Sequence, residues 1–125
     1  MDLRLLEDGL ETVSCLYAER FGIERDDTWF VLKLGEEVGE LTQAFLMRAG
    51  QARDKGLSPA ELDRAFRAEV SDVLAQVLIM ARHFGVDVQD ELERKWLSRN
   101  PDWVTRSAVN GDHRTGCQCP PAADA

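Results

Sequence analysis

Two short acidic motifs carry the side chains with the clearest chemical potential in this sequence. The string EEVGE places Glu37 three residues before Glu40, and the string EVSD places Glu69 three residues before Asp72. On a helix, each pair lies on one face, one turn apart. Like charges at this spacing destabilise a helix, so stability alone does not explain them. Carboxylates gathered in this way are hard oxygen ligands of the kind that suit Mg²⁺ or Mn²⁺.

Apolar residues recur at helical spacing in four segments, and no alternating strand pattern competes with them. The clearest boundary is the string Ser58-Pro59-Ala60-Glu61, which combines a capping serine, a proline at the first helical position and the glutamate of a capping box. Short connections favour antiparallel neighbours, so the sequence predicts an all-α, four-helix bundle. The expected helices run from Asp2 to Glu19, from Asp26 or Asp27 to near Gly50, from Ser58 to Gly85, and from Asp87 to Asn100.

The acidic residues lie beside the apolar stripes that would pack the second and third helices together. At about 100° per residue, Val38 and Phe45 belong to one stripe, and Glu37 lies on its margin. The third helix repeats the arrangement, with Val70 in the stripe and Glu69 at its side. Packing the stripes together would face the carboxylates across a shared cleft. Further apolar residues widen the third stripe, so the second half of this helix is expected to be buried on most sides: Leu74, Leu78 and Ala81.

The composition is that of one folded, water-soluble domain. The chain has 125 residues, of which 44% are hydrophobic and 30% charged, and it contains no run of roughly 18 apolar residues and no signal peptide. We therefore expect a cytoplasmic protein that does not associate with membranes. The net charge of −8 argues against binding to nucleic acid, because Lys and Arg supply that affinity. A small phosphorylated ligand stays possible where a divalent cation bridges it to carboxylates.

The folded domain is expected over residues 1–103, with residues 104–125 forming a disordered tail that lacks helical periodicity. This tail contains Cys117 and Cys119, which are either inert or ligands of a soft metal. The sequence lacks a second Cys/His pair at zinc-like spacing, which favours the inert interpretation. Cys15 falls on a helical apolar pattern and is expected to be a small buried residue.

The acidic motifs, with their flanking residues, resemble a known family. The strings KLGEEVGEL, which begins at Lys33, and EVSDVL, which begins at Glu69, are similar to those of the all-α nucleoside triphosphate pyrophosphohydrolases. This MazG-like superfamily includes dimeric dUTPases and phosphoribosyl-ATP pyrophosphatase. The resemblance continues through the Gly85-Val-Asp turn and covers roughly Trp29 to Asp102.

The resemblance implies Mg²⁺-dependent hydrolysis of a nucleoside triphosphate at the α–β bond, which yields the monophosphate and pyrophosphate. By similarity, Glu37, Glu40, Glu69 and Asp72 would coordinate Mg²⁺, with Mn²⁺ as a possible substitute. Glu36 would orient or deprotonate the attacking water, or help to hold an additional metal ion. Metal ions lower the pKa of bound water and neutralise charge that develops on phosphate oxygens, which suits this reaction.

Five further residues are candidates for contact with the substrate. Lys33 lies one turn before the acidic motif, and either reaches phosphate or neutralises the carboxylates. Lys95 and Arg99 are four residues apart, so they would share a helix face that either binds polyphosphate or is simply solvated. Asn100 lies in a region that contacts the nucleotide in relatives. Trp29 either stacks on a base or belongs to the core.

Other functions stay open at this stage. The substrate is expected to be a deoxynucleoside triphosphate or a chemically altered nucleotide, as in a house-cleaning enzyme, but phosphoribosyl-ATP is a rival. A non-enzymatic, metal-binding regulatory module of helices is the alternative from another class. A unit with one acidic face commonly needs a partner to close its cleft, so we expect a homodimer or a homotetramer.

Overall fold

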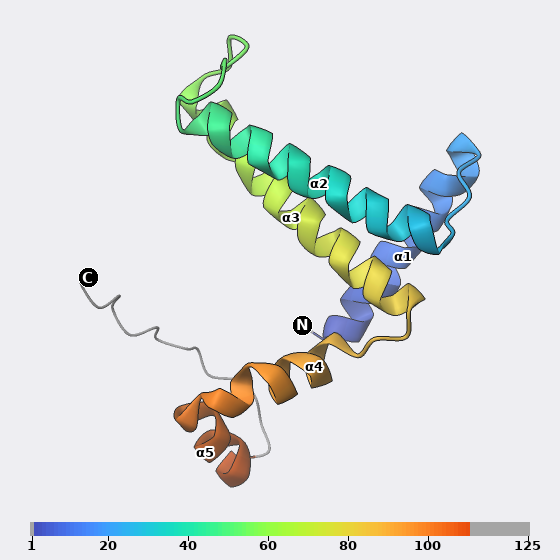
Figure 1. Cartoon of the computed structure of the whole chain (residues 1–125), viewed down its shortest axis with the longest axis vertical. Coiled ribbons are helices and arrows are strands. Elements are labelled where there is room, and N and C mark those ends of the chain that lie inside the picture. The colour runs from blue at the N-terminus through green and yellow to red at the C-terminus, as the bar shows by residue number, and fades with distance from the viewer. Residues whose placement is uncertain (1, 111–125) are drawn as a thin grey trace. The chain divides into compact units, whose positions relative to one another are not determined.

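The computed structural model describes residues 2–110, and within that range every regular element is helical. The all-α prediction is therefore confirmed. The chain divides into two compact units, Met1–Val88 and a second that begins at Gln89. In the described range, no helix is long and apolar enough to cross a membrane. The elements are α1 (Leu3–Phe21), α2 (Asp27–Arg48), α3 (Pro59–His83), α4 (Val88–Lys95), the 3-10 helix η1 (Leu97–Arg99) and α5 (Pro101–Asn110) (Figure 1).

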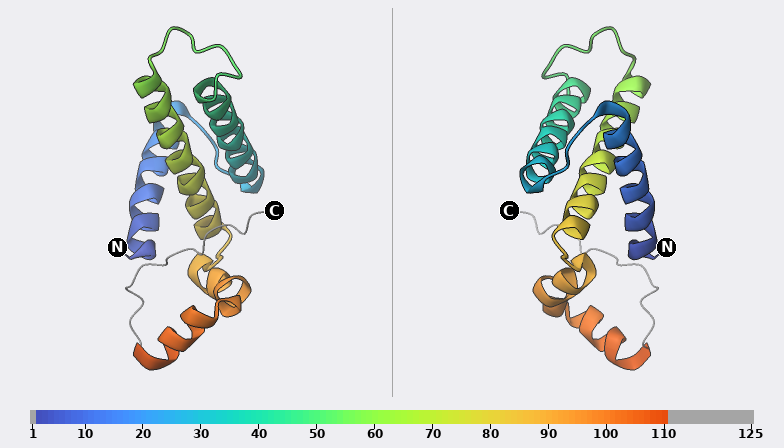
Figure 2. Two further views of the ribbon diagram at one scale, coloured as in Figure 1. Left: turned by 90° about the vertical axis from the view of Figure 1, so that its left-hand side faces the viewer. Right: turned by 90° about the vertical axis from the view of Figure 1, so that its right-hand side faces the viewer.

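In the first unit, α2 and α3 form a long antiparallel pair, and α3 lies between α2 and α1 (Figure 2). Contacts at both ends fix the register of the pair. At one end, Arg48 Nε donates to Asp63 Oδ1 over 2.8 Å. At the other, His83 Nε2 lies 2.6 Å from Asp27 Oδ1. The acidic motifs fall in the middle of this pair, which is why they can meet.

The boundaries of α2 and α3 follow the capping signals in the sequence. The Asp26 side chain caps α2 by accepting a hydrogen bond from the backbone N–H of Trp29 over 2.8 Å. At the start of α3, the capping box is complete, because Ser58 Oγ accepts from Glu61 N and Glu61 Oε2 accepts from Ser58 N. Gly85 follows the end of α3 with φ of 67°, a left-handed conformation that favours glycine.

The core of the first unit is small and centres on Phe30 and Leu78, which are 2% and 1% exposed. Phe30 stacks on the ring of His83, with 4.1 Å between centroids. Smaller buried residues complete the core: Ala18, Ala44, Leu62, Ile79 and Ala81.

The predicted stripes are less buried than expected. Val38, Phe45 and Val70 stay nearly half exposed, and Leu74 is 53% exposed. The reason is that the first unit consists of three helices, α1, α2 and α3, so each helix has few neighbours to cover it. Because α3 alone is flanked by two of them, the helices of the first unit leave the outer faces of the apolar stripes uncovered. The second half of α3 is nevertheless largely covered, as predicted, because Leu78 and Ala81 are buried and every residue from 75 to 81 is buried or partly buried.

Cys15 is only partly buried and contacts polar side chains, which corrects the prediction of a small buried apolar residue. Arg25 donates to Glu11 Oε1 over 2.7 Å and to Ser14 Oγ over 3.1 Å, and its guanidinium approaches Cys15 Sγ. The hydrogen bond from Arg25 lowers the pKa of Glu11, although burial opposes it. The hydrogen bond with Glu11 in turn raises the pKa of the Cys15 thiol. This cluster joins the segment between α1 and α2 to α1.

Replacing Glu11 with glutamine is expected to destabilise the protein at neutral pH by about 1–3 kcal/mol, because a charged hydrogen bond to Arg25 is lost. A carboxylate with a lowered pKa stabilises the fold above its ordinary value of 4.5, and this contribution disappears as the pH falls through the folded-state pKa. The difference between wild type and variant should therefore shrink on acidification. Urea unfolding at neutral pH and well below pH 4.5 measures it, with Glu19→Gln on the same helix as the control. A difference that is constant with pH would contradict the prediction.

The second unit departs from the predicted single helix that ends at Asn100. Here α4 ends at Lys95, η1 follows, and α5 begins at Pro101. Asn100 Oδ1 accepts hydrogen bonds from the backbone N–H groups of Asp102 and Trp103, so it caps α5. An asparagine cap and a proline at the first position favour the start of a helix here. The helix extends to Asn110, past the expected domain end at Trp103. Residues 111–125, with Cys117 and Cys119, lie outside the described residues.

Candidate metal centre

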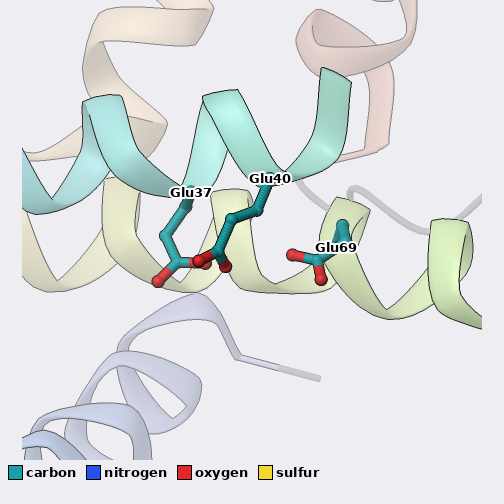
Figure 3. A group of neighbouring side chains, drawn as sticks. All are labelled: Glu37, Glu40 and Glu69. Atoms are coloured by element: carbon teal, nitrogen blue, oxygen red, sulfur yellow. The ribbon is translucent and has the colours of Figure 1, made fainter. Parts of the chain in front are cut away.

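Three of the four predicted metal ligands converge in the middle of the α2–α3 pair. Oxygen atoms of Glu37, Glu40 and Glu69 lie within 4.8 Å of one another (Figure 3). Glu37 and Glu40 come from adjacent turns of α2, and Glu69 reaches them from α3. The arrangement follows from the three-residue spacing on one helix and the antiparallel register of the other.

The cluster is electrostatically unfavourable without a cation. Glu37 is buried, and Glu69 is half-buried. Burial raises the pKa of Glu69, and the neighbouring charges of Glu40, Asp72 and Glu37 raise it further. Desolvation and repulsion between carboxylates are the costs that a divalent ion removes.

One carboxylate oxygen of Glu69 lacks a hydrogen-bond donor among the described residues. Its Oε2 atom is buried and has no hydrogen-bond partner in residues 2–110. Gln76 Oε1, two turns further along α3, is in the same condition. A buried acceptor without a partner costs about 1–3 kcal/mol, and a cation would satisfy the carboxylate. The donor set and the unpartnered Glu69 oxygen therefore fit a Mg²⁺ or Mn²⁺ ion.

Asp72 is exposed and is not among the carboxylates whose oxygens converge. Its charge still lies close enough to raise the pKa of Glu69. Asp72 therefore borders the cluster formed by the three glutamates, and its role as a fourth ligand stays a prediction.

Lys33 belongs to the site through its contacts with the acidic motif. Its Nζ lies 2.9 Å from Glu37 Oε1 and 3.2 Å from Glu36 Oε1. Burial lowers the pKa of Lys33, but the hydrogen bonds to Glu37 and Glu36 outweigh it and raise the pKa overall. Of the two roles left open by the sequence, the structure shows neutralisation of the carboxylates. Glu36 itself is exposed and points its carboxylate to this lysine.

Replacing Lys33 with methionine is expected to destabilise the metal-free protein by about 1–3 kcal/mol, because Glu37 stays buried without its cation. Mg²⁺ should recover more stability in this variant than it adds to the wild type, since the lysine no longer competes for Glu37. Thermal unfolding with and without Mg²⁺ measures both effects, and Lys95→Met, an exposed lysine of the second unit, serves as the control. Equal stabilisation of variant and wild type by Mg²⁺ would show that Lys33 and the metal do not share Glu37.

The remaining predicted residues are not part of the glutamate cluster. Trp29 is half-buried and packs edge-to-face on Phe30, with 5.0 Å between ring centroids, which supports the core interpretation. Lys95, Arg99 and Asn100 belong to the second unit, and their approach to a polyphosphate stays a prediction. The expectation that Lys95 and Arg99 share one α-helical face is wrong, because α4 ends at Lys95. The Asn100 side-chain oxygen is occupied in capping α5.

A small recess beside the cluster was missed by the sequence interpretation. It has a volume of about 200 Å³. The other lining residues, apart from Gln43, lie at helical intervals from the two glutamates. Two follow Glu40 on α2, and two precede Glu69 on α3. Ala44 lies four residues after Glu40, and Ala65 lies four residues before Glu69. That symmetric pair of alanines on facing helices is the signal that could have revealed the recess. The lining residues are Glu40, Gln43, Ala44, Met47, Leu62, Ala65 and Glu69.

The likeness to known proteins rests on the motifs alone. No family model matches the chain, and no curated protein or solved structure is significantly similar to it. The resemblance to MazG-like pyrophosphohydrolases therefore stays a prediction, and the geometry of the cluster is the independent support for a metal site.

Proposed function

We propose that this protein is a Mg²⁺-dependent nucleoside triphosphate pyrophosphohydrolase of the MazG-like type, which cleaves the α–β bond. The observation that carries the proposal is the convergence of three glutamate carboxylates, one of them with a buried and unpartnered oxygen. Carboxylate oxygens are the ligands by which proteins hold Mg²⁺ next to phosphate groups. The net negative charge of the chain is compatible with such a substrate, because the metal supplies the positive charge that phosphates need.

Glu37, Glu40 and Glu69 would hold the ion, with Asp72 at the border of the site. When bound, Mg²⁺ would neutralise charge on the phosphate oxygens and increase the acidity of a bound water. Glu36 would orient the attacking water or accept its proton, or help to hold a second ion, since it is exposed, precedes Glu37 and lies outside the group of three glutamates. Lys33 bridges Glu36 and Glu37, so it holds the base and one ligand in a fixed relation.

The recess supports a nucleotide as the phosphate-bearing substrate. It starts at Glu40 and Glu69, and its walls further on are mainly apolar, formed by Ala44, Met47 and Leu62 among others. An apolar recess next to a metal centre suits a flat, weakly polar group attached to phosphates, as a nucleobase is. Its side chains do not distinguish a pyrimidine from a purine, so the substrate panel must include both.

Release of pyrophosphate from a panel of nucleotides with Mg²⁺ or Mn²⁺ tests the activity. The panel should contain the common dNTPs and NTPs, chemically altered nucleotides and phosphoribosyl-ATP. Identification of monophosphate and pyrophosphate as products would establish cleavage at the α–β bond. Metal binding without turnover of any nucleotide would instead support the alternative, a metal-binding regulatory module.

We also propose that the protein forms a homo-oligomer, because several large apolar side chains of the first unit are not covered by its own helices. Val38, Phe45 and Leu74 are among the large apolar residues that are 45% or more exposed, and large exposed apolar side chains are often covered at an interface between subunits. We expect sedimentation to show a dimer or tetramer, and Leu74→Glu to shift it toward the monomer. Arg64→Glu on the same helix is the control, and a monomeric wild type would contradict the assembly.

A further inference from the structure

Lys33 and a cation at the glutamate cluster would compete for the same carboxylate. Without a bound cation, Lys33 Nζ lies 2.9 Å from Oε1 of the buried Glu37. Because Mg²⁺ binds oxygen at about 2.0–2.1 Å, the ammonium group and the ion would lie within about 5 Å of each other, where repulsion inside a protein is strong. We therefore expect Lys33 to leave Glu37 when the ion binds.

A displaced Lys33 needs a second acceptor besides Glu36. Lysine carries its charge on a flexible four-carbon stem with three rotatable N–H donors, and the contact with Glu36 Oε1, over 3.2 Å, uses only one of them. The Glu36 side chain is 57% exposed, whereas that of Lys33 is only 25% exposed. The new acceptor must therefore lie on the more buried side of Lys33, toward α3.

Gln76 on α3 has a buried acceptor without a donor. Its Oε1 atom has no hydrogen-bond partner in residues 2–110, and among the side-chain atoms of that range only Glu69 Oε2 shares this condition. A buried acceptor that stays unpaired is unfavourable, and such groups are rare in folded proteins. The Glu69 oxygen is explained by the cation that it would bind, but the Gln76 oxygen needs a hydrogen-bond donor.

The register of the α2–α3 pair places Gln76 opposite Lys33. Glu40 and Glu69 face each other across the pair (Figure 3). Lys33 lies seven residues before Glu40, and Gln76 lies seven residues after Glu69. Since seven residues span nearly two full turns and the helices are antiparallel, both residues are displaced in the same direction along the pair and keep the faces of the two glutamates. At the usual spacing of about 8–10 Å between helix axes, a lysine and a glutamine can reach each other.

We propose that Gln76 accepts a hydrogen bond from Lys33 when a divalent cation takes Glu37, and so makes room for the ion. Gln76 is then a positioning residue, which acts through the lysine and contacts neither the ion nor the substrate. Each position of Lys33 satisfies one buried group: Glu37 in the metal-free protein, and Gln76 in the metal-bound one. The inference rests on the proposed function and deepens it, because the transfer sets how tightly the metal centre binds its ion.

The affinity of the full chain for Mg²⁺, measured by calorimetry without nucleotide, tests this transfer. The four proteins are the wild type, Gln76→Met, Lys33→Met and the double variant, because methionine is unbranched and fills the space of either side chain. In the wild-type background, Gln76→Met is expected to weaken Mg²⁺ binding about tenfold, since a hydrogen bond from a charged donor is lost. In the Lys33→Met background, the same substitution should have no effect, because no ammonium group is displaced.

Thermal unfolding in a chelator distinguishes this role from a structural one. Gln76→Met should leave the metal-free protein at least as stable as the wild type, because it removes a buried acceptor that has no partner. The control is Gln51→Met, at an exposed glutamine in the connection between α2 and α3, which should change neither stability nor Mg²⁺ affinity. A metal-free Gln76→Met protein that is clearly less stable than the wild type would overturn the inference, since Gln76 would then be paired without the ion.

The remaining outcomes separate this inference from the proposed function. An equal loss of Mg²⁺ affinity in both backgrounds would make Gln76 a metal ligand, and no loss in either would leave Lys33 on Glu36 alone. Both results overturn the transfer and leave the metal centre in place. If the wild type binds no Mg²⁺, the metal centre and the transfer fail together. If Lys33 and Gln76 are coupled but no nucleotide releases pyrophosphate, the proposed function fails and the transfer stands.

Discussion

Replacing Glu69 with glutamine is expected to lower Mg²⁺-dependent pyrophosphate release by about 100-fold or more, and at the same time to stabilise the metal-free protein. Residues that merely orient metal ligands contribute about 10–100-fold to affinity or activity, so a ligand should contribute at least as much. The gain in stability follows because burial and neighbouring carboxylates raise the pKa of Glu69. A carboxyl group with a raised pKa destabilises the fold when it is ionised, and glutamine removes that charge.

Opposite changes in activity and stability distinguish a functional glutamate from a structural one. Kinetics over a range of Mg²⁺ concentrations and thermal unfolding in a chelator supply the two measurements. Glu24→Gln is the control, since this exposed carboxylate has no hydrogen bond or ion pair in the described range and lies outside the cluster. If Glu69→Gln destabilises the metal-free protein and leaves the Mg²⁺ dependence unchanged, the metal centre is wrong.

Replacing Phe30 with alanine is expected to destabilise the protein by about 3–5 kcal/mol, the largest effect of any single truncation in the first unit. Phe30 is 2% exposed and contacts three side chains, of which one, His83, belongs to another helix. It stacks on His83, packs against Trp29 and lies under the Arg25 guanidinium, 5.3 Å from its ring centroid. Its removal therefore loosens α2 from α3 and from the segment before α2.

Denaturant unfolding measures this effect. Phe21→Ala is the matched control, because Phe21 is 56% exposed at the end of α1 and should cost less than about 1 kcal/mol. Similar losses for the two variants would contradict a core centred on Phe30.

The elements around the site were predictable because their signals are local. The capping box at Ser58, the cap at Asp26 and the glycine stop at Gly85 each act within a few residues of sequence, so α2 and α3 have nearly the expected bounds. The three-residue spacing of Glu37 and Glu40 then placed both carboxylates on one face. Local periodicity therefore predicted most of the glutamate cluster.

The features that were not predicted depend on contacts between residues distant in sequence, or on small side chains that leave space unfilled. Asp72 lies outside the converging group because the register of α3 against α2 decides which turn faces the glutamates. The exposure of Leu74 depends on where α1 lies, which periodicity within α3 does not encode. The recess exists because Ala44 and Ala65 are small, and small residues leave only a weak pattern.

The second unit was predicted less well for a similar reason. The residue before a proline is pushed toward extended conformation, and Asn100 has ψ of 106°. The chain accommodates this by tightening to a 3-10 turn before the proline and then starting a new helix. The helical spacing of apolar residues such as Leu92 and Trp96 gives no sign of this break.

The two polar contacts at the ends of the α2–α3 pair help the acidic middle to stay packed without metal. Mutual repulsion between the glutamates pushes the two helices apart at their centre. The Arg48–Asp63 bridge and the His83–Asp27 contact hold them together on either side. The pair is therefore held at both ends while its centre carries the repulsion. Breaking either end contact should let the two helices separate and so weaken cation binding at the distant glutamate cluster.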